Sequence, residues 1–244
     1  MRETVILLHG FSGTGRAWEP VVERLAPERY RSIAPDIRGH GLVAGARPVS
    51  FAACVADVLA LGAGPFTLVG YSMGGRLALH VALAAPERVR RLVLVATTAG
   101  IEDEVERAAR RASDERLADR VSRESLGAFA ERWLTQPMFR DDPPAAQRRA
   151  REDILRNEPA GLAAALRGIG TGAMEPLWHR LDELRMPARV LAGERDAKFA
   201  SLARRLAGAL PAAELRLVPG AGHALVREEP AAVAAAIAGG RDRP

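Results

Sequence analysis

Short apolar runs, rich in leucine and β-branched residues, alternate along the chain with stretches in which apolar residues recur at helical spacing. Runs of this length predict buried strands, and the periodic stretches predict helices. The expected strands are Val5–Leu8, Ser32–Ala34, Phe66–Val69, Arg91–Val95, Ala188–Leu191 and Leu215–Val218. The expected helices are Ala17–Leu25, Phe51–Leu61, Gly75–Ala84, Ser201–Leu210 and Pro230–Ala238. This order indicates an α/β fold, with a mostly parallel central sheet and helices on both faces.

The alternation stops after Val95, and the segment from about 101 to 184 shows only charged helical stretches interrupted by prolines. An all-helical segment between two strands is expected to lie near the carboxyl edge of the sheet, where loops carry function. We therefore expect residues 1–100 and 185–244 to form the core and residues 101–184 to form an inserted helical cap.

The composition is that of one compact protein. A chain of 244 residues with 48% hydrophobic content can bury roughly three-quarters of the surface that it exposes when unfolded. Cys54 is the only cysteine, which excludes an internal disulfide. The net charge of +5 comes from arginine, since Lys198 is the only lysine. Because the basic residues are interspersed with acidic ones and form no concentrated block, nucleic-acid binding is not expected.

The chain begins a strand within five residues of Met1 and has no basic leader followed by an apolar segment. It also lacks an apolar run of about eighteen residues, the length needed to span a membrane. We expect a cytoplasmic protein with no membrane insertion. The sequence does not determine the oligomeric state, and we favour a monomer.

The motif Gly70-Tyr71-Ser72-Met73-Gly74 stands between a predicted strand and a predicted helix. This G-x-S-x-G pattern holds a serine on a sharp turn, with its hydroxyl exposed above the helix N-terminus. The Met73 N–H at that N-terminus can stabilise a developing negative charge. A second amide is expected from Phe11, in the glycine-rich loop after the first strand, so that Phe11 and Met73 form an oxyanion hole. A turn of small residues without chemistry is the alternative.

Asp196 and His223 each follow a predicted strand, and loops at the carboxyl ends of parallel strands converge on one crevice. The chain order Ser72, Asp196, His223 is that of the α/β-hydrolase fold. In such a triad the histidine removes the serine proton, and the aspartate holds the imidazole in the useful tautomer. Asp196 alone could instead cap the following helix. Asp36, after an early strand, is the rival acid, and we favour Asp196.

Other chemistries lack their signatures. The loop after the first strand does not carry the dinucleotide fingerprint G-x-G-x-x-G, and no Walker lysine is present. His80 and His179 have no suitable neighbouring ligands, which argues against zinc. We expect neither a cofactor nor a metal.

Several longer motifs extend the pattern beyond the triad. They are Gly70-Tyr71-Ser72-Met73-Gly74-Gly75-Arg76, Glu106-Arg107-Ala108-Ala109-Arg110 leading to Ser113-Asp114, Trp133 followed by Gln136-Pro137-Met138-Phe139, Gly168-Ile169-Gly170-Thr171-Gly172 before Leu177-Trp178, and Gly193-Glu194-Arg195-Asp196-Ala197-Lys198-Phe199. On these motifs, the chain from about Val5 to Pro230 resembles the α/β-hydrolase-fold 2-succinyl-6-hydroxy-2,4-cyclohexadiene-1-carboxylate (SHCHC) synthases of menaquinone biosynthesis.

The resemblance implies a cofactor-free lyase. Family members eliminate pyruvate from 2-succinyl-5-enolpyruvyl-6-hydroxy-3-cyclohexene-1-carboxylate to give the cyclohexadiene. Ser72, activated by His223, would act as a base on a ring C–H, and the amides of Phe11 and Met73 would hold the enolate-like oxygen of the succinyl ketone. No acyl-enzyme is required.

The implied substrate is a small polycarboxylate with three carboxylates, which arginines can bind in bidentate fashion. Arg76 lies one helical turn after Ser72 and can face the same crevice. Arg110 matches the family's cap arginine, although a solvated face is the alternative for both residues. Tyr71 and Trp133 match positions that line the site in the family, and Trp133 can also serve in packing.

The sequence departs from the family at Ile154, where another carboxylate-binding arginine is expected eight residues before the leucine matched by Leu162. Arg151 lies one turn earlier and Arg156 lies two residues later. Either arginine could substitute, and the sequence does not choose between them.

Three functions follow from these observations, and the lyase is favoured. The alternative on the same triad is a carboxylesterase or carbon–carbon bond hydrolase that acts through an acyl-enzyme. A non-enzymatic receptor on a hydrolase scaffold is the third, and the intact Ser72, Asp196 and His223 argue against it. Arg76 and Arg110 suit a polyanionic substrate, whereas a simple esterase would want an apolar cap.

Overall fold

The computed structural model describes residues 2–139 and 141–239, and its centre is one parallel sheet of six strands in the order β2-β1-β3-β4-β5-β6. All neighbouring strands pair in parallel. The strands are β1 (Glu3–Leu8), β2 (Tyr30–Ile33), β3 (Phe66–Tyr71), β4 (Val89–Val95), β5 (Ala188–Gly193) and β6 (Ala213–Val218). Each lies at one of the six predicted positions, and the predicted α/β-hydrolase architecture is confirmed.

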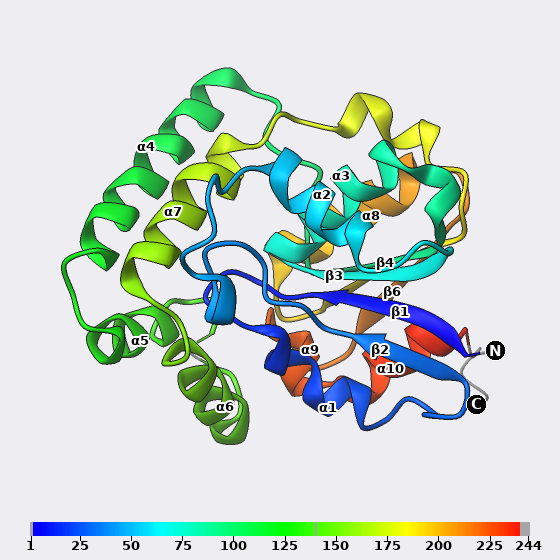
Figure 1. Cartoon of the computed structure of the whole chain (residues 1–244), viewed down its shortest axis with the longest axis horizontal. Coiled ribbons are helices and arrows are strands. Elements are labelled where there is room, and N and C mark those ends of the chain that lie inside the picture. Colours follow the sequence, from blue (N-terminus) through cyan, green and yellow to red (C-terminus); the bar gives the residue numbers. More distant parts are fainter. Residues whose placement is uncertain (1, 140, 240–244) are drawn as a thin grey trace.

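Helices cover both faces of this sheet (Figure 1). One face carries α2 (Phe51–Ala60), α3 (Met73–Ala84) and α8 (Ala197–Ala209), and the other carries α1 (Glu19–Val22), α9 (Leu225–Glu228) and α10 (Pro230–Ala238). The side chains of β1 alternate between the two cores: Ile6 and Leu8 join the first, and Val5 and Leu7 join the second. A strand buried on both sides reads as a continuous apolar run, which is why its sequence is so distinctive.

Four α-helices follow β4 before the chain returns to β5: α4 (Glu104–Val121), α5 (Leu126–Leu134), α6 (Pro144–Ile154) and α7 (Pro159–Ile169). The short 3₁₀ helices η4 (Thr171–Ala173) and η5 (Trp178–Glu183) complete this helical insertion, which we define as α4 to η5. Helices α4–α7 lie beyond the carboxyl ends of the strands (Figure 1). They enclose a core of their own around Phe129, Leu162 and Leu166.

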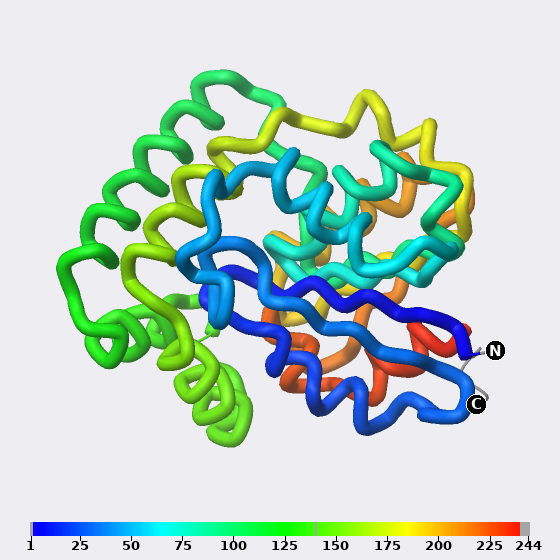
Figure 2. Tube along the Cα trace, in the orientation of Figure 1, coloured from blue at the N-terminus to red at the C-terminus, as the bar shows by residue number. Residues whose placement is uncertain are grey.

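The chain path places the start of β1 and the end of α10 on the same side of the molecule, away from α4–α7 (Figure 2). Within residues 2–139 and 141–239, none of the helices combines the length and the apolar character needed to cross a lipid bilayer.

The first predicted helix, Ala17–Leu25, is broken up in the structure. A 3₁₀ helix, η1 (Gly15–Trp18), leads into α1, which has only one α-helical turn (Glu19–Val22). Pro20 has no N–H to donate to the preceding turn, so a continuous α-helix through it is unfavourable. After Val22 the backbone continues with short-range bonds such as Leu25 N–H to the Val22 carbonyl at 3.0 Å.

Candidate active site

Ser72 occupies the turn between β3 and α3 in a strained backbone conformation, with φ of 52° and ψ of −108°. The space at positions 70 and 74, on either side of the serine, admits only glycine. A Cβ at Gly70 would lie 2.4 Å from the Gly74 carbonyl oxygen, and one at Gly74 would lie 2.1 Å from the Leu8 carbonyl oxygen. The strand and helix approach each other this closely because both flanking positions lack a side chain, and the bend presents the serine hydroxyl to the pocket.

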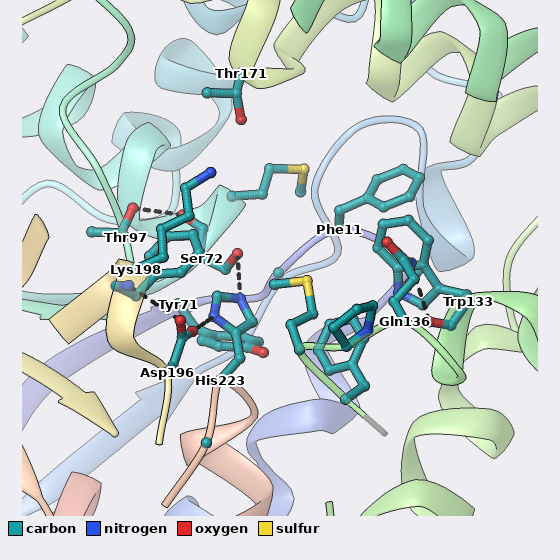
Figure 3. Close-up of a pocket in the computed structure, with 18 of the residues that line it drawn as sticks. Phe11, Tyr71, Ser72, Thr97, Trp133, Gln136, Thr171, Asp196, Lys198 and His223 are labelled. Carbon is teal, nitrogen blue, oxygen red and sulfur yellow. Dashed lines mark hydrogen bonds and ion pairs between the residues drawn. The ribbon is translucent and has the colours of Figure 1, made fainter. Parts of the chain in front are cut away.

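Ser72, His223 and Asp196 form a continuous chain of contacts (Figure 3). Nε2 of His223 lies 3.2 Å from Oγ of Ser72, and Nδ1 of His223 lies 2.8 Å from Oδ2 of Asp196. Asp196 follows β5 and His223 follows β6, so the parallel sheet brings together residues that are far apart in sequence. Both distances are within reach of a proton relay.

Aromatic side chains surround the imidazole of His223, which is 1% exposed. Its ring centroid lies 4.4 Å from that of Phe199, 5.5 Å from that of Tyr71 and 5.7 Å from that of Phe139. Phe139 belongs to the helical insertion, so the insertion covers the relay. Exclusion of water strengthens the electrostatic interactions of the groups inside.

The two aspartates that the sequence left in competition have different partners. Asp196 contacts His223 through Oδ2 and also accepts the Phe199 N–H at 3.1 Å through Oδ1. It therefore caps α8 as well as contacting the imidazole, and the helix starts at Ala197 rather than at Ser201. Asp36 accepts the Gly15 N–H at 2.7 Å and the Leu42 N–H at 2.8 Å. Its carboxylate braces two loops, and both of its oxygens are engaged there.

The two expected oxyanion donors line the same pocket as Ser72. Met73 is the first residue of α3, so its N–H has no acceptor within the helix. Phe11 lies on the loop after β1, across the pocket from Lys198 and Thr97 (Figure 3). An N–H on each side of the serine is the arrangement that this fold uses to hold an oxyanion.

The loop that carries Phe11 is held from the helical insertion. Asp153 on α6 accepts the Thr14 N–H at 3.0 Å and also the Thr14 hydroxyl. Asn157, just after α6, donates to the Ser12 carbonyl at 2.9 Å and accepts the Gly41 N–H at 3.0 Å. Both side chains are buried, so these hydrogen bonds fix the loop without competition from water.

Two buried histidines join the same loop to the loop after β2. Nε2 of His9 accepts the Ile37 N–H at 2.9 Å, and Nε2 of His40 accepts the Ser12 N–H at 3.3 Å. Burial lowers the pKa of both imidazoles, that of His40 to about 3. Each ring is therefore neutral at physiological pH and can accept a hydrogen bond.

Arg76 lies in the pocket, as expected, but is buried rather than solvated. Its Nη1 donates to the Ile169 carbonyl at 2.8 Å. Burial lowers the pKa of Arg76 to about 9, and repulsion from Arg110 contributes. A desolvated guanidinium with a second cation nearby favours the binding of an anion.

Arg110 also lines the pocket and is about two-fifths exposed. Its Nε lies 2.8 Å from Oδ1 of Asp114, whose other oxygen accepts the Gly172 N–H at 3.1 Å. Asp114 thus fixes the Arg110 guanidinium in the pocket lining, near enough to Arg76 to affect its pKa.

Tyr71 and Trp133 are both part of the pocket lining. Burial raises the pKa of the Tyr71 hydroxyl, which therefore stays protonated and able to donate a hydrogen bond. The Trp133 ring packs on Phe129 at 5.5 Å and on Phe11 at 5.2 Å between centroids. Trp133 consequently contributes both to the core of the insertion and to the pocket wall.

The structure does not bring the two predicted substitutes for the missing cap arginine into the pocket. Arg151 and Arg156 are exposed, and neither lines the pocket, whereas Ile154 is buried and does line it. Ala150 and Ile154, one turn apart on α6, form the inward face. Arg151 is rotated by about 100° from Ala150 around the helix, which turns its side chain outward.

The pocket has a volume of about 590 Å³ and includes cationic residues that the sequence analysis did not select. Lys198 follows Asp196 closely, and Arg227 lies on α9 just after His223. Lys198 could have been found from its position beside the acid. Arg227 sits in a charged stretch that reads as a solvated helix end, and no local signal distinguishes it. Among residues 2–139 and 141–239, no three potential metal ligands cluster.

Comparison with known proteins places these features in a wider context. A family profile described as "alpha/beta hydrolase fold" matches residues 3–230. A Bacillus subtilis (strain 168) protein provisionally named 2-succinyl-6-hydroxy-2,4-cyclohexadiene-1-carboxylate synthase is 38% identical, with 93% of this chain and 86% of that protein covered. The synthase of that name from Salmonella schwarzengrund (strain CVM19633) is 35% identical, with 96% and 92% covered.

Two solved structures are also similar. MenH from S. aureus superposes with a TM-score of 0.91 at 30% identity, and the match covers 97% of this chain and 92% of that one. A thermophilic esterase from Thermogutta terrifontis, crystallised with malate, superposes with a TM-score of 0.80 at 31% identity, covering 97% and 88%. The same overall architecture therefore occurs in chains named for two different reactions.

Proposed function

The chain belongs to the α/β-hydrolase superfamily and, within it, to the SHCHC synthase family, and on that premise we propose that it eliminates pyruvate from 2-succinyl-5-enolpyruvyl-6-hydroxy-3-cyclohexene-1-carboxylate. The product is 2-succinyl-6-hydroxy-2,4-cyclohexadiene-1-carboxylate. One observation of this chain carries the proposal: the Ser72–His223–Asp196 relay opens into a pocket that is also lined by Arg76 and Arg110. A base and a polyanion-binding surface are the two things that this elimination requires.

The first step is removal of a ring proton. The ring double bond starts at carbon 3 and the product is a 2,4-diene, so the proton must leave carbon 2, beside the succinyl ketone. His223 takes the proton of Ser72 at Nε2, and the Ser72 oxygen then removes the carbon-bound proton. The electron pair moves onto the ketone oxygen, where the Phe11 and Met73 amides stabilise it.

The second step expels the leaving group. The electron pair returns from the ketone oxygen through the ring, the bond between carbon 5 and the enolpyruvyl oxygen breaks, and the second ring double bond forms. The departing enolate takes the proton that His223 holds and becomes pyruvate, which returns the imidazole to its neutral form. No oxidant, reductant or cofactor enters this balance, and no acyl-enzyme forms.

Arg76 and Arg110 bind carboxylates of this substrate. Both line the pocket, and Asp114 and the Ile169 carbonyl hold the two guanidinium groups in place. Fixed guanidinium groups orient a substrate at a low entropic cost, and orientation is a major part of the rate advantage of an enzyme.

Ester hydrolysis is the second candidate, because the chain is 31% identical to a protein named as an esterase and the same relay can attack a carbonyl. The deciding experiment measures pyruvate release from the enolpyruvyl substrate beside hydrolysis of p-nitrophenyl esters. We expect rapid pyruvate release and slow or absent ester turnover. Fast ester turnover with a burst of p-nitrophenol and no pyruvate would reject the lyase.

A further inference from the structure

Most positive side chains in the pocket lining have protein partners that hold them. Arg76 donates to a backbone carbonyl, and Arg110 pairs with Asp114. Arg195 donates to the Gly220 carbonyl at 2.7 Å and pairs with Glu228 at 2.6 Å. These contacts occupy part of the hydrogen-bonding capacity of each cation.

Arg227 differs from them. Its side chain is 10% exposed and lines the pocket, although it comes from α9 on the core side. Its one ion pair among the described residues is long, with Nη2 3.5 Å from Oδ2 of Asp153. Its Nε is buried and makes no hydrogen bond. A largely buried guanidinium with few hydrogen bonds is costly unless a ligand completes them.

The acidic residues around Arg227 do not fully satisfy it. Asp153 uses its two oxygens for the Thr14 N–H and the Thr14 hydroxyl. Glu228 accepts the Gly222 N–H at 2.9 Å and pairs with Arg195. Burial raises the pKa of Asp142 to about 7, and repulsion from Glu228 contributes, so this carboxyl is only partly ionised at neutral pH. Hydrogen-bond donors of the Arg227 guanidinium consequently remain available beside the pocket.

Arg227 also lies close to the reacting end of the pocket. It is four residues after His223 on the same loop and helix. Burial is the main cause of the raised pKa of the Tyr71 hydroxyl. The positive charge of Arg227 is the next largest cause, and it lowers that pKa. Tyr71 itself directly precedes Ser72. The hydroxyl of Tyr71 and the guanidinium of Arg227 are thus two donors in the pocket lining near the serine.

We propose that Arg227 is a substrate-binding residue that holds one carboxylate of the tricarboxylate substrate, completing a set of which Arg76 and Arg110 hold the others. This assignment rests on the proposed function. Arg227 would supply the substrate with a cation from the core side of the pocket. The α6 position at which an arginine was expected instead presents the apolar Ile154. The assignment also explains why the Arg227 guanidinium lies next to the loop of His223 with a donor that makes no hydrogen bond.

The test compares the KM for pyruvate release in the wild type, Arg227→Met and Arg149→Met. Arg149 is an exposed arginine on α6 outside the pocket lining, so its variant is the matched control. Loss of one charged hydrogen-bonding partner is expected to raise KM about 10- to 100-fold in Arg227→Met. The control should keep the wild-type KM. Arg227→Gln, which keeps an amide able to contact Asp153, carries the test with the same expectation if the methionine variant does not fold.

A binding measurement separates recognition from turnover. In the Ser72→Ala background, calorimetry with the intact substrate should give a dissociation constant that rises with Arg227→Met by a similar factor. If Arg227 serves only as a structural partner of Asp153, its replacement will lower the melting temperature but leave KM and the dissociation constant unchanged, and the assignment is overturned. A wild type that releases no pyruvate would instead overturn the proposed function itself.

Discussion

The carboxylate of Asp196 holds His223 through one oxygen, 2.8 Å from Nδ1, while its other oxygen accepts a backbone N–H at the start of α8. The sequence allowed Asp196 to be either a helix cap or the acid beside the histidine, and in the structure it makes both contacts. The cap fixes the carboxylate, and the carboxylate in turn fixes the imidazole tautomer.

Replacement of Asp196 should separate these two roles. Asp196→Asn retains an acceptor for the Phe199 N–H but loses the charge beside His223, so kcat should fall roughly 10³- to 10⁴-fold with little change in melting temperature. Asp196→Ala should lose as much activity and also about 1 kcal/mol of stability. Pyruvate release and thermal unfolding measure the two effects. An asparagine variant with wild-type kcat would contradict this role.

Ser72 should be dispensable for folding and essential for turnover. Ser72→Ala is expected to reduce pyruvate release at least a thousand-fold while preserving the fold. Because the position has a φ of 52°, Ser72→Gly should be more stable than Ser72→Ala by about 1 kcal/mol, although it is equally inactive. Denaturant unfolding of both variants tests this order. A glycine variant less stable than the alanine variant would show that the backbone here is not strained.

Arg76→Met should weaken substrate binding more than catalysis. The methionine keeps much of the buried volume but removes the charge, so KM for the tricarboxylate should rise about 10- to 100-fold. Arg90→Met, at an exposed position on β4, is the control. Turnover of an uncharged ester, where measurable, should be unaffected by either change. Equal loss of activity on charged and uncharged substrates would indicate a structural effect only.

Stability should fall as the pH falls below about 6.5. The pKa of His40 is lowered to about 3 by burial, so the unfolded chain binds a proton in this window that the folded chain does not. Each pH unit below about 6.5 should then cost about 1.4 kcal/mol from this residue, down to about pH 3. Melting temperatures of the wild type and His40→Asn, measured from pH 7 to 4, test this. The variant should show a shallower dependence, and an identical slope would exclude His40 as a cause.

Much of the fold could be predicted because strands buried on both faces leave continuous apolar runs, as in β1 and β4. The relay could be predicted because Ser72, Asp196 and His223 each follow such a run, and parallel strands bring their carboxyl ends together. Pro20 lies in the first turn of α1 and disfavours an α-helix that starts earlier, an effect that hydrophobic periodicity alone does not register.

The binding residues were harder to predict because they depend on helix rotation and on contacts between distant segments. Arg151 and Arg156 lie close in sequence to Ile154, the expected arginine position, but both are exposed to solvent. Their orientation follows from the packing of α6, which the sequence does not specify. The Arg227 side chain is largely covered because α6 packs beside α9, with Asp153 at 3.5 Å. Sequence spacing within either segment contains no trace of that contact.

Asp153 and Asn157 come from the helical insertion, yet they hold the loop that presents Phe11. An engineer who grafts a foreign lid to change substrate preference would remove these anchors together with the old pocket wall. The graft would need its own acceptor for Thr14 and its own donor for the Ser12 carbonyl. Lid swapping in this scaffold should therefore succeed only when the transplanted segment brings those two groups with it.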